Sequence, residues 1–201
     1  RASYGALDID FIQTRSVYYI YNNSEPAVGG RIALTLDLTR DLMATLGTSF
    51  TAGHYDPSRT QSYAIWGLDL YMRLARINLH AEYLIRRTQM GRSGPGDEVF
   101  RYGPGDDGEY DYDFLKDGFY IEANAPLGTH VELVGRFDGL RRIGNVPVGS
   151  VLRKESGMLR YTAGVNFIFE GSVRLKLSGE LYDFSDFDDE VAVNAGVVAA
   201  F

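Results

Sequence analysis

The side chains best equipped for chemistry are charged residues that lie an even number of positions apart within largely apolar stretches. Asp69 and Arg73 lie in one such stretch, and Glu82 and Arg86 lie in the next. Carboxylate and guanidinium groups in these numbers can form ion pairs, bind charged ligands or line a water-filled passage. Which of these they do depends on the elements that position them.

The sequence contains few residues that are candidates for catalysis or metal binding. The chain has no cysteine, and its three histidines, His54, His80 and His130, lie in different segments. We therefore expect no two of them to share a metal site or a catalytic triad. The nearest local group is His54 with Asp56 and Asp69. The sequence predicts no enzyme activity, no metal and no bound cofactor.

Acidic residues cluster in two glycine-containing stretches that we expect to be loops. The longer one, 90–116, is predicted to be an outer loop whose carboxylates could narrow an adjacent passage and favour cations. Its candidate constriction residues are Asp106, Asp107, Glu109, Asp111 and Asp113. The second cluster lies in 183–190. Neither has the spacing of an EF-hand calcium loop, so we expect solvated acidic loops.

Composition narrows the class of protein. The 201 residues carry a net charge of −7 and include 14 Tyr, 11 Phe and 23 Gly, a mixture that favours β structure. No apolar run is long enough for a transmembrane helix. Basic residues form no cluster, which makes nucleic acid an improbable partner. The opening residues lack the apolar core of a signal peptide, so we expect a processed or truncated chain.

Apolar and polar residues alternate along most of the chain. In the stretch 32–38, for example, Ile32, Leu34, Leu36 and Leu38 are separated by Ala33, Thr35 and Asp37. This period of two predicts strands with one apolar and one polar face. The alternating segments are 4–21, 30–39, 42–54, 62–74, 76–89, 117–125, 130–141, 157–169, 172–184 and 190–201.

The lengths of these segments and of their connections favour a membrane barrel. Most are about ten to fourteen residues long, whereas strands of soluble proteins average about five or six, and a tilted strand needs about nine to eleven to cross a bilayer. Short connections alternate with long ones, which is typical of outer-membrane barrels with inner turns and outer loops. The prediction is an all-β, antiparallel transmembrane β-barrel of about ten strands, forming a single domain over 1–201.

The charged positions of the alternating segments are predicted to face the lumen of this barrel. They are Asp8, Asp10, Arg31, Asp37, Asp69, Arg73, Glu82, Arg86, Glu122, Glu132, Arg136, Asp138, Arg160, Arg174, Lys176 and Glu180. In a closed ten-stranded barrel they would pair into a structural polar core, because so narrow an interior is filled by side chains. In a larger barrel they would line water and set a weak ion selectivity. The residues themselves leave both alternatives open.

The end of the chain and several long stretches resemble known outer-membrane proteins. The last segment ends in Phe201. It resembles the C-terminal strand of outer-membrane barrels, which ends in phenylalanine and is recognised by the barrel-assembly machinery. The stretches GFYIEANAPL, VELVGRFDGLRR and RYTAGVNFIFEGSVRLKLSGELY, with 51–90, resemble the C-terminal portion of Gram-negative porins, most nearly the phosphate-selective porin-like family. The chain departs from that family in its few strands and its three lysines, so phosphate selectivity is not implied.

This resemblance implies a bacterial outer-membrane location and two functional alternatives. The first is a porin or porin-like channel for passive diffusion of small hydrophilic solutes or ions. The second is a closed, non-conducting barrel that acts as a structural anchor, adhesin or accessory subunit of an envelope complex. The implied partners are outer-membrane lipid, lipopolysaccharide, the barrel-assembly machinery and further copies in a homo-oligomer such as a trimer. An omptin-like protease is also a ten-stranded barrel, but the residues around His54 do not resemble it.

Overall fold

The protein is all-β in a computed structural model that describes residues 25–56, 58–89, 113–143, 155–169 and 173–199. Nine strands account for nearly all of these residues. They are β1 (Val28–Thr39), β2 (Leu42–His54), β3 (Ser62–Leu74), β4 (Ile77–Gln89), β5 (Asp113–Pro126), β6 (Val131–Ile143), β7 (Glu155–Phe169), β8 (Val173–Phe184) and β9 (Glu190–Ala199).

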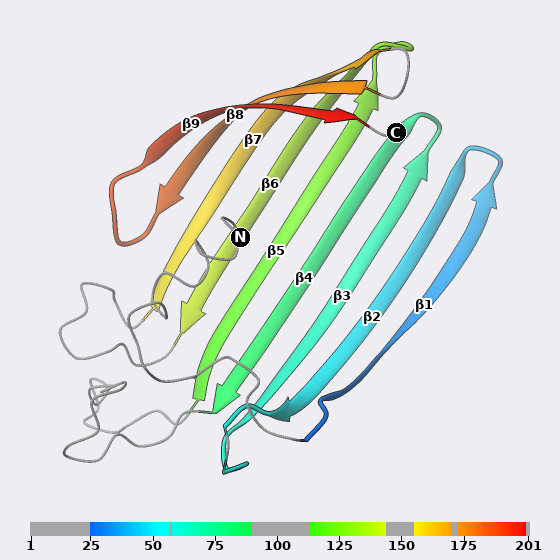
Figure 1. Ribbon diagram of the computed structural model, residues 1–201. Coiled ribbons are helices and arrows are strands. Elements are labelled where there is room, and N and C mark those ends of the chain that lie inside the picture. Colours follow the sequence, from blue (N-terminus) through cyan, green and yellow to red (C-terminus); the bar gives the residue numbers. More distant parts are fainter. Residues whose placement is uncertain (1–24, 57, 90–112, 144–154, 170–172, 200–201) are drawn as a thin grey trace.

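The strands form one antiparallel sheet in chain order, from β1 to β9. The sheet curls along its width, so that β8 and β9 arch back over the middle strands (Figure 1). Within the described residues β1 and β9 are not paired with each other, and the sheet is open. The structure thus confirms the all-β antiparallel fold, while the predicted closed barrel goes beyond it. The predicted first strand, 4–21, lies outside the described residues.

The observed strand bounds follow the alternating segments closely, with one exception. β5 begins at Asp113, whereas the sequence predicted a strand from residue 117 and a loop over 90–116. The prediction was wrong for 113–116, because Asp113 and Lys116 break the apolar pattern and read as loop residues. Backbone pairing with β4, from Gln89↔Asp113 to Arg86↔Lys116, extends the strand through them.

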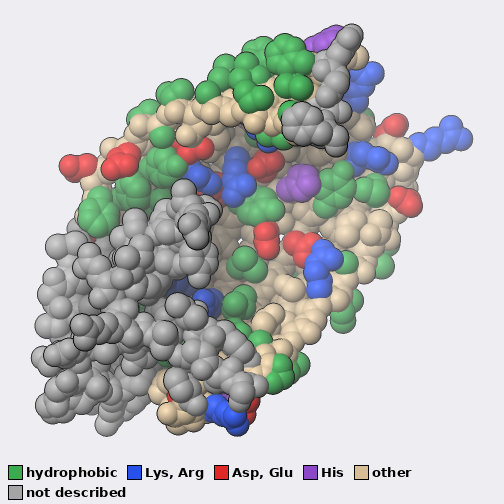
Figure 2. Space-filling view, viewed as in Figure 1, with side chains coloured by type: hydrophobic (Ala, Val, Ile, Leu, Met, Phe, Trp, Pro, Cys, Tyr) green, Lys and Arg blue, Asp and Glu red, His purple; other side chains and the backbone are tan. Residues whose placement is uncertain are grey.

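Cross-strand register sorts the side chains onto two faces. Directly paired residues share a face, and successive residues of a strand alternate between faces. One face is apolar and exposed, as at Ile32 (77%) and Val193 (83%). The other is polar and more crowded, and Asp138 is 6% exposed. Figure 2 shows charged side chains in the hollow of the sheet and hydrophobic ones outside β8 and β9, so the polar face is the concave one.

Connections of different length lie at opposite ends of the sheet (Figure 1). Short turns at 40–41, 75–76 and 127–130 join strands at one end, which we call the turn end. At the other, the loop end, β2 continues into β3 through 55–61 and β8 into β9 through 185–189. β4 and β6 also end at the loop end, where β5 and β7 begin. The alternation of short and long connections is as predicted.

The β3–β4 turn holds Ala75 in the left-handed region, with a φ of 52°. A Cβ atom is unfavourable in this conformation, which glycine adopts freely. The amide of Ala75 donates a hydrogen bond to the carbonyl of Asp41 at 2.6 Å, which ties this turn to the neighbouring β1–β2 turn.

We predict that Ala75→Gly stabilises the protein by about 0.5–1 kcal/mol, because it relieves the left-handed alanine. The free energy of unfolding from urea titration checks this. The matched control is Ala81→Gly within β4, where the same change should destabilise by a similar amount because a strand interior disfavours glycine. Equal effects of the two substitutions would contradict the assignment of strain to the turn.

Candidate functional site on the concave face

Register brings every charged residue of the described strands that the sequence placed in the lumen onto the concave face. The direct pairs include Asp69↔Glu82 and Glu122↔Arg136, and Arg73 pairs with the neutral Asn78. The full set on the described strands is Arg31, Asp37, Asp69, Arg73, Glu82, Arg86, Glu122, Glu132, Arg136, Asp138, Arg160, Arg174, Lys176 and Glu180. Asp8 and Asp10 lie outside the described residues. The sequence correctly predicted that these residues share a face, but it did not predict which of them are neighbours across strands.

Asp138 on β6 is the centre of the most connected cluster on this face. Arg160 approaches it from β7: Nε donates to both carboxylate oxygens at 3.1 Å, and Nη2 donates to Oδ1 at 3.0 Å. Arg136 on the same strand donates from Nε to Oδ1 at 2.7 Å. The Asp138 side chain is only 8% exposed. A carboxylate this buried needs paired charge, and two guanidinium groups supply it.

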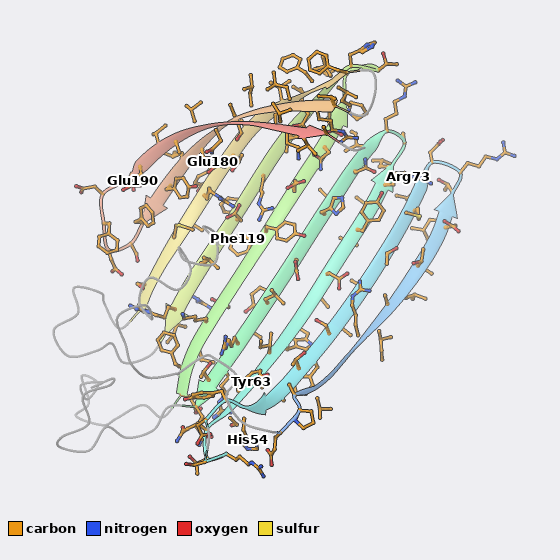
Figure 3. The ribbon with its side chains drawn as sticks, in the orientation of Figure 1. His54, Tyr63, Arg73, Phe119, Glu180 and Glu190 are labelled. Carbon is orange, nitrogen blue, oxygen red and sulfur yellow. The ribbon has the colours of Figure 1, made fainter. Side chains whose placement is uncertain are left out.

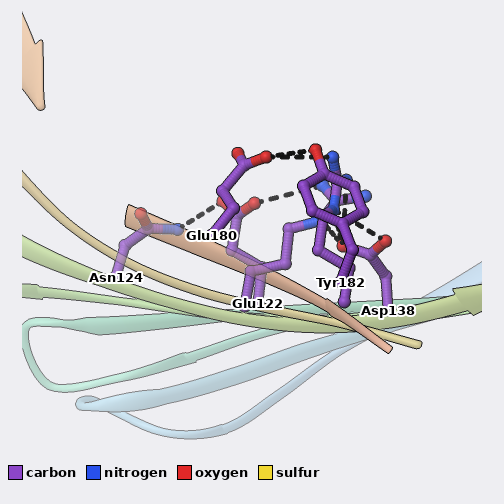
Figure 4. Close-up of polar contacts among 7 residues, drawn as sticks. Glu122, Asn124, Asp138, Glu180 and Tyr182 are labelled. Atoms are coloured by element: carbon purple, nitrogen blue, oxygen red, sulfur yellow. Dashed lines mark hydrogen bonds and ion pairs between the residues drawn. The ribbon is translucent and has the colours of Figure 1, made fainter. Parts of the chain in front are cut away.

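The cluster extends to both sides through four further side chains (Figure 4). Arg136 Nη1 lies 3.3 Å from Glu122 Oε2, and Asn124 Nδ2 donates to the other oxygen of Glu122 at 2.9 Å. On the opposite flank Glu180 lies 3.7 Å from Arg160 Nη1 and accepts from the Tyr182 hydroxyl. The network therefore spans β5 to β8.

Two carboxylates, Asp69 and Glu82, lie directly opposite each other on β3 and β4. Like charges in this position are destabilising unless a cation is near. Arg31 on β1 reaches across β2 and donates from Nη2 to Asp69 Oδ1 at 2.5 Å. It passes over Gly47, where a Cβ would clash with both side chains. Gly47 therefore leaves the space in which the two side chains meet.

Two participants were not in the predicted set. Asn124 and Tyr182 are uncharged and lie on the concave face beside predicted residues. Their parity within the alternating segments is a signal that includes them, since each lies two residues from a predicted position. Which side chains bond to one another cannot be read from parity, because it depends on cross-strand register.

The predicted loop constriction is not assembled in the described residues. Asp106, Asp107, Glu109 and Asp111 lie outside them, as does Phe201. Asp113 belongs to β5 and pairs with Arg87 of β4 at 2.5 Å, on the apolar face at the loop end. Its assignment to the loop was wrong because the ladder between β4 and β5 continues past the apolar pattern.

A second ion pair lies on the apolar face near the loop end. Arg141 donates from Nε and Nη2 to Asp117 at 3.1 and 2.7 Å, and the Tyr83 hydroxyl donates to the same carboxylate at 3.0 Å. The Asp117 side chain is 12% exposed. With Arg87 and Asp113, these residues bound the apolar surface of β4–β6 on the loop side.

The structure separates His54 from Asp69 of the nearest local His–Asp group. His54 lies at the loop end, far from Arg73 and Glu180 (Figure 3), and its Nδ1 is 3.0 Å from Glu25 Oε2. Asp69 is on the opposite face of the sheet from His54. Asp56 lies in the β2–β3 loop, where its carboxylate accepts hydrogen bonds from Thr60 and Gln61.

No helix in the described part of the chain is long and apolar enough to cross a membrane. Among the same residues, no three His, Asp or Glu side chains are grouped so as to hold a metal ion. Comparison with known protein families, with curated proteins and with solved structures found no match.

The Asp138 cluster gives a prediction for stability. Asp138→Asn leaves two arginines facing a neutral group and should lower the free energy of unfolding by about 2 kcal/mol, less than a fully buried pair because both arginines are partly exposed. Urea titration measures it. The matched control is Glu190→Gln, an exposed carboxylate in the same cross-strand row, which should change stability by less than about 0.5 kcal/mol. Equal losses would contradict a special role for Asp138.

The β2–β3 loop gives a prediction for pH dependence. Partial burial acts to raise the pKa of Asp56, but hydrogen bonds from Gln61 and Thr60 outweigh it and leave the pKa below its ordinary value. The charged form thus orders the loop above the ordinary aspartate pKa, and this order should be lost as pH falls through the lowered pKa. Hydrogen exchange at the Gln61 amide tests this, and in Asp56→Asn the exchange should lose its transition at acidic pH.

Proposed function

We propose that this protein is an integral outer-membrane β-barrel of the porin type that allows passive diffusion of small hydrophilic solutes or ions. One observation carries the proposal: a single register makes one face of the nine-stranded sheet largely apolar and exposed, and gathers most of the charged strand residues on the other face. A soluble protein rarely exposes so continuous an apolar surface. Lipid outside and water inside would suit both faces.

The length of the apolar stretch on β3 also supports a lipid environment for the outer face. The outward residues of β3 are apolar at every second position from Ala64 to Leu74. At about 3.3 Å per residue and a tilt of about 40°, this stretch spans roughly 25 Å. That is the height of the apolar band of an outer-membrane barrel. Aromatic pairs such as Phe50 with Trp66 add to this surface.

Closure of the barrel has a directional requirement. β1 and β9 are both odd members of an antiparallel series, so they run in the same direction. An antiparallel barrel therefore needs an odd number of additional strands between them. The predicted strand 4–21 would meet this requirement, and so would three, five or another odd number of strands of a longer protein or of another chain.

The concave face suits a channel of mixed charge. Its described strand residues include both carboxylates and guanidinium groups, and Arg73, Glu132, Arg174 and Lys176 lie toward the turn end. A lumen with both signs of charge would conduct small ions with weak selectivity. The acidic residues of 106–111 remain candidates for narrowing its outer entrance.

The alternative, a closed and non-conducting barrel acting as an anchor, adhesin or accessory subunit, is favoured by one specific feature. The Asp138 cluster joins four adjacent strands and occupies the middle of the concave face. In a narrow barrel such a network would fill the interior rather than line water.

The proposed partners follow from the outer face and the last strand. Lipid and lipopolysaccharide would cover the apolar surface, and the segment ending at Phe201 would be read by the barrel-assembly machinery. A homo-oligomer such as a trimer would pack through a flat area, which a directly paired row of small residues provides on β5–β8. That row is Ala123, Gly135, Ala163 and Gly179.

Two measurements on the purified protein test this proposal. In flotation with liposomes we expect the folded protein to rise with the lipid. Recovery in the aqueous fraction would refute the membrane location. In planar bilayers at 1 M KCl we expect stepwise ion currents; inserted protein that gives no steps would exclude the porin and leave the closed barrel. Heat-denatured protein is the control for both measurements.

A further inference from the structure

Charges on the concave face are arranged in layers along the strands. Toward the loop end, Arg86 of β4, Lys116 of β5 and Arg142 of β6 are paired directly with one another in sequence order. We call these three residues the basic row. Like charges in direct cross-strand register repel each other, and an anion placed over them lowers that repulsion. The sequence singled out Arg86 alone, because Lys116 was assigned to a loop.

Aromatic rings and a hydroxyl hold the basic row in place. Lys116 Nζ and Arg142 Cζ lie 5.2 and 5.8 Å from the centre of the Phe114 ring. Arg86 Cζ lies 5.5 Å from the centre of the Tyr63 ring, and Arg86 Nε donates to Thr88 Oγ1 at 3.0 Å. Each of the three cations also takes part in further interactions. A ligand would therefore meet positioned cationic groups.

An apolar row lies next to the basic row on the same polar face. It consists of Leu84, Leu140, Met158 and Phe184, on β4, β6, β7 and β8. Leu84 is 40% exposed and Leu140 is 53% exposed, so these leucines face the hollow without being covered. Exposed leucines are uncommon on this face, which carries most of the charged strand residues, and they offer a surface for a hydrophobic group.

Glycines make the apolar row flat between β3 and β6. A Cβ at Gly67 would come within 2.8 Å of Leu84 Cδ2, and one at Gly118 within 2.7 Å of Leu140 Cδ2. The leucine side chains thus lie over the neighbouring glycines instead of standing upright. Neither the basic row nor the apolar row contains an aspartate or glutamate on the described strands.

We propose that the basic row and the apolar row together form a binding site for an amphipathic organic anion, a carboxylate on a hydrocarbon body. The two rows are two residues apart along β4, β5 and β6, which is about 6.6 Å. The carboxylate would accept hydrogen bonds from Arg86, Lys116 and Arg142, and its body would lie on Leu84 and Leu140. This proposal extends the proposed channel function by naming a class of solute. The conductance test of the binding site rests on that channel function.

Octanoate is the probe, and acetate is its control because it has the same head without the body. In planar bilayers, octanoate added on the loop side should block the current saturably, while acetate at the same concentration should not. Lys116→Gln and Leu140→Ser should each raise the half-blocking concentration about tenfold, the effect of losing one charge-assisted hydrogen bond or one leucine contact. Arg40→Gln, in the β1–β2 turn, is the matched control and should not change it.

Binding is also measured without conductance, so that the two proposals fail separately. Equilibrium dialysis of radiolabelled octanoate against the protein in nanodiscs, with empty nanodiscs as blank, should show saturable binding that both variants weaken. Circular dichroism confirms that each variant is folded. Equal block by acetate and octanoate, or unchanged dialysis binding in Lys116→Gln and Leu140→Ser, would overturn the site. Absent currents with saturable octanoate binding would overturn the channel alone.

Discussion

Antiparallel pairing in a nearly constant register is the constraint on which the rest of this structure depends. Nine strands pair in chain order, with one irregularity between Asp37 and Thr39. Because side chains alternate with a period of two, a one-residue slip between any two strands would move charges to the apolar face and leucines to the polar one. Register therefore fixes an apolar surface and a charged surface at the same time, and each of them demands its own environment.

The charged surface is organised by distance from the two ends of the sheet. In the middle, carboxylates and guanidinium groups neutralise each other around Asp138 and between Arg31 and Asp69. Toward the loop end the charges become purely basic at Arg86 and its neighbours, with exposed leucines between the two zones. A solute moving along this face would thus meet a basic, then an apolar, then a neutralised layer. In a channel these layers would line water, whereas in a closed barrel they would form a packed polar interior. A measurement of ion conductance distinguishes the two alternatives.

The sequence predicted the strands well because alternation is a local property. β2 and β3 have the predicted bounds, and β1, which was expected from residue 30, begins at Val28. The sequence-based prediction was wrong at the start of β5, where charged side chains interrupt the apolar alternation but backbone pairing with β4 continues the strand. Concave-face charges were grouped correctly, since parity is fixed within each strand. Asp69, which the sequence grouped with His54, lies on the opposite face of the sheet, because the β2–β3 register places the two residues at positions of opposite parity.

The sequence by itself determined the all-β class, the antiparallel hairpins and which side chains share a face, because a period of two and short turns act over a few residues. Tertiary structure alone decided which of those side chains meet. Asp138 and Arg160 become partners through the β6–β7 register, and Arg86, Lys116 and Arg142 become one row through two further registers. Such contacts join residues far apart in the chain, so their chemistry is set by how strands align rather than by any local pattern.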